Sequence, residues 1–252
     1  MNRHVLTSLV VGLIISLSSC SKKEDPKPTY AINQTSVSIN YDKEHQFTVK
    51  LGEKTADAAG FTWTSSDPSV GTISGTGLFK GKKIGSTTIK AEGNGTVLTA
   101  ELTIKPYSTL FKEPIIEFGV SIATIKGKES RKLIEQASNG LLYEGENSKI
   151  KQIMYIFENS KLAGAAALFE STKPVVEEVV QFYSERYTYL GEDEDFFVFS
   201  DGKYLIGIGE DNTLGVHAIY LPVPATNTLK IGSLSSLFGQ KLKEIELKSI
   251  SK

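Results

Sequence analysis

Side chains that could carry out acid–base, metal or thiol chemistry are few in this chain and lie far apart in the sequence. Beyond the first 20 residues there are two histidines, His45 and His217, and neither has the partner spacing of a zinc site. His217 could serve a Ser-His-Asp triad, but no G-x-S-x-G motif places a serine nucleophile. We therefore predict that His217 is a surface residue of a sheet, and that the protein has no catalytic residue, no metal and no cofactor.

Two further stretches match binding motifs only in part. Glu192-Asp193-Glu194-Asp195 supplies the carboxylates that calcium prefers, but it lacks the glycine-centred spacing of a calcium loop, so we predict a solvated loop. Gly207-Ile208-Gly209 lacks the third glycine, the following helix and the Lys-Ser/Thr pair of phosphate-binding loops. A glycine pair inside a strand instead indicates a bulge or close packing.

Aromatic side chains between residues 183 and 199 are the remaining candidates for a binding surface. The set is Tyr183, Tyr187, Tyr189, Phe196, Phe197 and Phe199. Successive residues of a strand point to opposite faces, so Phe196 and Phe197 must diverge, and one of them is expected to be exposed. An exposed aromatic strip would suit a glycan or protein ligand, whereas burial under helices is the alternative interpretation.

The N-terminal 20 residues have the features of an export signal. A basic start precedes an apolar run from Val5 to Leu17, which is too short to span a bilayer. The following Leu17-Ser18-Ser19-Cys20 resembles the bacterial lipobox, and Cys20 is the single cysteine of the chain. The resemblance implies that residues 1–19 are a lipoprotein signal peptide and that lipid on Cys20 anchors the protein in a membrane. An ordinary secretory signal with an incidental Cys20 is the alternative.

Residues 20–30 form a predicted tether between this anchor and the first folded domain. The segment from Ser21 to Pro28 is charged, has two prolines and contains no large apolar residue, which is typical of an extended linker. A charged run directly after the lipidated cysteine also resembles the surface-export signal of Bacteroidetes lipoproteins, although Lys22-Lys23 makes it less acidic. We expect an outer-membrane lipoprotein of the cell envelope, with exposure at the cell surface as the further implication.

The composition of the chain limits the classes of partner that it can bind. The chain has 28 Lys and Arg against 29 Asp and Glu, which gives no electrostatic case for binding nucleic acid. Its hydrophobic content of 40% is that of a globular protein with an apolar core. With one cysteine, that core has no disulfide to support it.

Residues 31–106 have the pattern of a small β-sandwich, with short alternating strands separated by turn signals. The seven expected strands cover residues 36–39, 46–51, 61–63, 70–73, 77–80, 87–91 and 98–104. Three stretches, Trp63–Val70, Gly77–Gly81 and Gly85–Ile89, resemble the group 2 bacterial immunoglobulin-like domain. The resemblance implies an all-β immunoglobulin-like sandwich that acts as a spacer or adhesive module. We expect Trp63 in its core, with a sugar-stacking platform as the alternative.

Residues 107–225 have a mixed pattern that occurs twice. Each half begins with a helical stretch, at Ser121 and at Pro174, and continues with four strands, ending at Phe169 and at Leu221. We therefore predict an α+β domain, a pseudo-repeat of helix plus four antiparallel strands, with its helices on one face of the sheet. In the second helix, Glu177, Glu178 and Glu185 are expected on the solvent-facing side. The start of this domain resembles uncharacterised Bacteroidetes lipoproteins and brings no known activity.

The C-terminal tail, residues 226–252, is expected to be an amphipathic helix or a closing strand, packed on the α+β domain. Together these features predict a membrane-anchored lipoprotein in which an Ig-like stalk presents a non-catalytic binding or adhesion domain. Two alternatives stay open: an envelope hydrolase with its site on the C-terminal domain, and a structural or inhibitory partner of another envelope protein.

Overall fold

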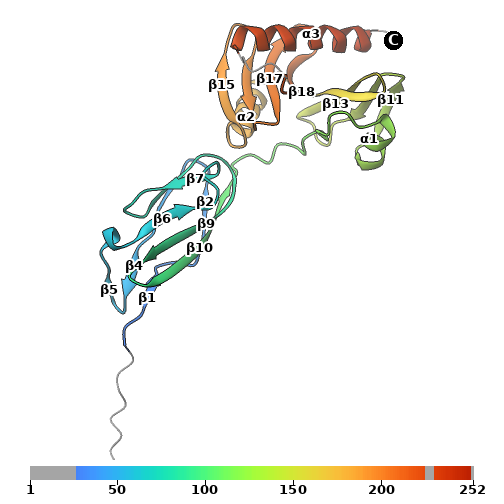
Figure 1. Cartoon of the computed structure of the whole chain (residues 1–252). Coiled ribbons are helices and arrows are strands. Elements are labelled where there is room, and N and C mark those ends of the chain that lie inside the picture. Colours follow the sequence, from blue (N-terminus) through green and yellow to red (C-terminus); the bar gives the residue numbers. More distant parts are fainter. Residues whose placement is uncertain (1–26, 225–229, 251–252) are drawn as a thin grey trace, which may run out of the picture.

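The chain forms two folded parts joined end to end by a connection that follows residue 105 (Figure 1). The structure, a computed structural model, describes residues 27–224 and 230–250. The predicted signal peptide, Cys20 and most of the predicted tether therefore lie outside the described residues. Among the helices that the structure describes, none is both long enough and apolar enough to span a bilayer.

The N-terminal part is a sandwich of short strands in three sheets, with the orders β1-β4-β5, β2-β10-β9-β6 and β3-β8-β7. All pairings are antiparallel except β2 with β10. The strands are β1 Tyr30–Ile32, β2 Ser36–Asn40, β3 Glu44–Gln46, β4 Val49–Leu51, β5 Lys54–Thr55, β6 Thr62–Ser65, β7 Gly71–Ile73, β8 Leu78–Gly81, β9 Gly85–Gly93 and β10 Thr96–Lys105, with a 3-10 turn at Ala58–Gly60.

The alternating apolar residues of these strands fill the space between the sheets. Trp63 is buried, as expected, and its ring lies 6.4 Å from that of Phe47, which is fully buried. The expectation of one strand over residues 46–51 was wrong. The N–H of Phe47 still donates to the carbonyl of Gly77 on the β8 side, but the carbonyl of Thr48 accepts the N–H of Asn33, and the chain enters a different sheet at Val49. This change of sheet lets one short segment close both layers of the sandwich.

The C-terminal part is an eight-stranded antiparallel sheet with the order β11-β12-β13-β14-β18-β17-β16-β15. Its strands are β11 Leu133–Ala137, β12 Gly140–Glu144, β13 Ile150–Glu158, β14 Lys161–Phe169, β15 Thr188–Glu192, β16 Phe197–Ser200, β17 Tyr204–Asp211 and β18 Gly215–Pro222. Helix α1 (Ile122–Lys128) precedes the first four strands and α2 (Lys173–Ser184) precedes the last four.

The predicted repeat of helix plus four strands is confirmed by this order. Each half is a meander that starts at one edge of the sheet, and the two halves meet where β14 pairs with β18. Ser121 caps α1, as its side chain accepts the N–H of Thr124 at 3.2 Å. Asn159 and Ser160 both have positive φ, 50° and 63°, which is the two-residue hairpin turn expected between β13 and β14.

Both faces of this sheet are covered by helices. On one face α1 and α2 bury residues such as Ile125, Val179 and Phe182 against alternate residues of the strands. On the other face lies α3 (Ile231–Ile250), which buries Leu234, Phe238 and Ile245 against Met154, Ile156 and Ile219. Of the two predictions for the C-terminal tail, an amphipathic helix or a closing strand, the helix is therefore the one observed. The domain has three layers, with the sheet between helices on both faces (Figure 1).

Candidate ligand-binding cleft

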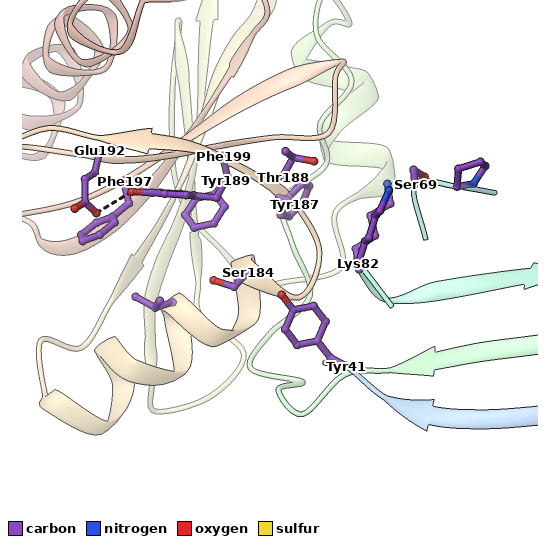
Figure 2. A pocket seen from close by; sticks show the side chains of 13 residues that line it. Tyr41, Ser69, Lys82, Ser184, Tyr187, Thr188, Tyr189, Glu192, Phe197 and Phe199 are labelled. Carbon is purple, nitrogen blue, oxygen red and sulfur yellow. Dashed lines mark hydrogen bonds between the residues drawn. The ribbon is translucent and has the colours of Figure 1, made fainter. Parts of the chain in front are cut away.

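A cleft of about 810 Å³ lies where the two parts of the chain meet. One wall is aromatic and comes from β15 and β16, the floor comes from α2, and the opposite wall comes from turns of the sandwich (Figure 2). The residues that line it are Tyr41, Pro68, Ser69, Lys82, Lys83, Val180, Ser184, Tyr187, Thr188, Tyr189, Glu192, Phe197 and Phe199. A cleft of this size at the junction of two domains is a usual place for a ligand.

The aromatic wall contains the exposed member of the Phe196–Phe197 pair. Phe196 is buried beneath α3, 5.4 Å from the ring of Phe238, whereas Phe197 is 44% exposed. Tyr189, 49% exposed, lies beside it and packs on the ring of Phe199 at 5.4 Å. The prediction that this pair diverges is therefore confirmed, and the exposed ring faces the cleft.

The two parts of the chain are joined at Glu185, the residue that follows α2. Its carboxylate accepts the N–H of Tyr107 at 2.9 Å and that of Ser108 at 3.3 Å, and both donors belong to the connecting segment. Its backbone carbonyl accepts the N–H of Ile84, in the sandwich, at 2.7 Å. The expected solvent exposure of Glu185 was wrong: it is fully buried, because α2 ends at Ser184 and the next residue turns into the joint.

Further contacts strengthen this joint. The guanidinium of Arg186 lies 3.6 Å from the centre of the Phe182 ring and donates to the carbonyl of Ser108 at 2.9 Å. The hydroxyl of Tyr107 donates to Asp42 of the sandwich at 3.2 Å. These bonds tie the connecting segment to both parts and so link the two walls of the cleft.

A carboxylate surrounded by tyrosines lies behind the aromatic wall. Tyr187, whose side chain also lines the cleft, donates to Oε2 of Glu113 at 2.7 Å, and Tyr220 donates to the same oxygen at 2.9 Å. The Tyr187 hydroxyl is also 3.0 Å from that of Tyr204, and Tyr220 is 2.6 Å from Tyr183. Burial raises the pKa of Glu113 although the tyrosine donors oppose it, and burial raises the pKa of Tyr204 to about 12.

This raised pKa predicts a pH-dependent stability that Glu113→Gln removes. Because the folded chain holds the Glu113 proton more tightly than the unfolded chain, its favourable contribution is present at low pH and is lost as pH rises from about 4.5 through the folded pKa. Relative to Glu113→Gln, the wild type should lose about 1.4 kcal/mol for each unit by which the pKa is raised. Urea unfolding between pH 4 and 7 measures the difference. Glu194→Gln, on an exposed turn, should leave the wild-type profile intact, and parallel profiles for wild type and Glu113→Gln would refute the prediction.

His217 is not the sheet-surface residue that was predicted, since only 1% of it is exposed. Its Nδ1 lies 2.8 Å from the carbonyl oxygen of Gly215 and 3.2 Å from Oδ2 of Asp211, so this nitrogen carries the proton. Alternation within β18 directs the ring toward the face that α3 covers, where it meets Phe196. His45 lies in β3 against Phe47, and burial lowers its pKa.

The partial motifs have structural roles. Gly207 lies under the ring of Phe238, where an added Cβ would be 2.6 Å from a ring carbon, so the glycine pair marks close packing. Asp193 accepts the N–H groups of Asp195 and Phe196 and thereby shapes the turn between β15 and β16. Within residues 27–224 and 230–250, no group of three His, Cys, Asp or Glu side chains has the geometry of a metal site.

The arrangement of short strands in residues 30–105 defines an immunoglobulin-like domain. Residues 28–104 match the family model of the bacterial Ig-like domain (group 2), as the motif from Trp63 to Ile89 predicted. Comparison with curated proteins gave no match.

Two solved structures match the chain at low similarity. Domains 5–6 of the S-layer protein SbsC are 13% identical, with a TM-score of 0.27, over 81% of this chain and 88% of that one. Domains 4–9 of surface layer protein SbsC are 14% identical, with a TM-score of 0.28, over 82% of this chain and 29% of that one. Such TM-scores carry no argument about function.

The sequence did not predict which residues of the sandwich line the cleft, nor which residues join the two parts of the chain. Lys82 and Lys83 follow an ordinary strand and have no local signal that they face a second domain. Glu185 does have a weak signal, because an acid at the C-terminal end of a helix is unfavourable to the helix dipole and so implies a compensating tertiary contact.

Proposed function

We propose that this protein is a lipoprotein of the cell envelope, anchored in the outer membrane through lipid on Cys20 and exposed at the cell surface. Its bacterial Ig-like domain acts as a stalk, and the α+β domain, together with the tip of that stalk, binds a ligand without chemical conversion. The lipobox resemblance and the charged segment after Cys20 support the anchor. The family match of residues 28–104 supports the stalk.

One observation carries the binding role: the cleft at the junction has two exposed aromatic rings, Tyr189 and Phe197, on one wall. Apolar side chains of this size are usually covered in a free-standing domain, and adjacent exposed ones mark an interaction site. A hydrolase that used His217 as its base would need the substrate to reach a ring that is 1% exposed, so the burial of this ring supports binding over hydrolysis at His217.

Replacement of Cys20 tests the anchor. Cys20→Ala removes the thiol that would be acylated, so we expect the protein to move from the membrane fraction to the soluble fraction, or to remain as an uncleaved precursor. Cell fractionation and metabolic labelling with a fatty acid measure both effects. Ser19→Ala keeps a small residue before the cysteine and should fractionate like the wild type. Wild-type protein that is unlabelled and soluble would contradict the anchor and leave the binding role to be judged at the cleft.

A further inference from the structure

The walls of the cleft differ in chemistry. On the side of the α+β domain, the rings of Tyr189 and Phe197 form an aromatic shelf, defined here as these two side chains (Figure 2). Tyr189 is held in place by packing on Phe199 and by its hydroxyl, which donates to Glu192 at 2.8 Å. Flat, exposed rings provide large contact area at low entropic cost, because few rotatable bonds have to be ordered on binding.

The sandwich side of the cleft is basic. Lys82 and Lys83 follow β8 and line the cavity, and among the described residues neither ammonium group has a carboxylate within 4 Å. The carboxylate of Glu192, which also lines the cleft, is already bonded to the Tyr189 hydroxyl. That hydroxyl is neutral and leaves the charge of Glu192 in place, so the lining carries two ammonium groups against one carboxylate. This excess of positive charge on the sandwich side, opposite an apolar shelf, suits an anionic ligand with an apolar face.

The sheet edge beside the cleft is poorly suited to an added peptide strand. β15 is the edge strand, but its register with β16 shifts between Tyr189 and Gly191. Ile231 of α3 packs against Gly191, where an added Cβ would lie 3.2 Å from its side chain. A bulge and a covering side chain are devices that prevent strand addition at an edge.

We propose that the cleft binds an acidic oligosaccharide, whose sugar rings stack on Tyr189 and Phe197 while its carboxylate or sulfate groups reach Lys82 and Lys83. This inference rests on the proposed binding function and assigns its ligand class. The apolar face of a pyranose ring matches the shelf in shape, and the hydroxyls of Ser184 and Thr188 are in the lining to meet those of the sugar. A volume of about 810 Å³ accommodates several sugar rings.

The test uses the full chain, purified in detergent, on an array of oligogalacturonates, chondroitin sulfate fragments, maltotetraose and cellotetraose, with extended peptides as a further arm. We expect retention on acidic oligosaccharides that weakens as salt increases. Tyr189→Ser with Phe197→Ser, and separately Lys82→Ser with Lys83→Ser, should each weaken retention at least tenfold. All four residues are solvent-accessible, so near-UV circular dichroism should confirm that both double variants stay folded.

Matched controls lie on the sandwich, far from the cleft. Val97→Ser replaces an apolar residue that is also exposed, and Lys50→Ser with Lys54→Ser removes two exposed lysines at the opposite end. Neither control should alter retention. The proposal is overturned if no acidic oligosaccharide is retained, or if either cleft double variant binds as tightly as the wild type. Binding of a neutral sugar or a peptide that is lost with Tyr189 and Phe197 would also overturn it, while leaving the proposed binding function in place.

Discussion

Glu185→Ala is expected to lower the free energy of unfolding of the C-terminal domain by about 3–5 kcal/mol and to loosen its junction with the Ig-like domain. The side chain is fully buried and accepts hydrogen bonds from Tyr107, Ser108 and Gln181. Its removal leaves the N–H groups of Tyr107 and Ser108 without their acceptor and removes the carboxylate that lies 3.4 Å from the guanidinium of Arg186. Each unsatisfied buried donor costs about 1–3 kcal/mol.

Two measurements separate the effects of this substitution. Urea unfolding gives the change in stability, and small-angle scattering with limited proteolysis between residues 105 and 109 reports on the junction. Glu177→Ala removes an acid from the exposed side of the same helix and should change neither. If Glu185→Ala keeps the wild-type scattering profile and protease resistance, the joint does not fix the two walls of the cleft, and ligand binding there would not depend on it.

Gly207→Ala and Phe238→Ala should each destabilise the protein strongly, but their costs should not add. Alanine at 207 would bring a Cβ to 2.6 Å from the Phe238 ring, which forces the α3 helix away from the sheet at a cost of about 1–3 kcal/mol. Phe238→Ala removes a fully buried ring at a cost of about 3–5 kcal/mol. In the double variant the new methyl group occupies space that the ring has left.

A double-mutant cycle by chemical unfolding measures this coupling, which should favour the double variant by at least about 1 kcal/mol. Gly239→Ala is the control, because the next position of α3 has nothing within 4 Å of an added Cβ. There alanine should be neutral or stabilising by up to about 1 kcal/mol, through its helix propensity. If the losses of unfolding free energy for Gly207→Ala and Phe238→Ala add, the ring of Phe238 does not pack closely on Gly207.

Local pattern was sufficient to predict most elements of the fold. Alternation and turn residues predicted both meanders of the C-terminal sheet, and the change from period 2 to period 3.6 predicted α2 between them. The motif around Trp63 predicted the Ig-like domain that the family match bears out. These features depend on residues close together in sequence, whose periodicity records which face of an element is buried.

Only the tertiary structure shows which polar residues are buried and which surfaces of the two domains face each other across the cleft. Periodicity assigned Glu185 to the solvent side of a helix and His217 to the surface of a sheet, but α2 ends at the domain junction and α3 covers the second face of the sheet. Lys82 and Phe197 line the same cleft although they are 115 positions apart in the sequence. Contacts over such separations are set by packing between domains, for which a single sequence contains no local signal. For Cys20 the opposite holds, because its proposed role as a lipid anchor is inferred from the residues next to it in the sequence.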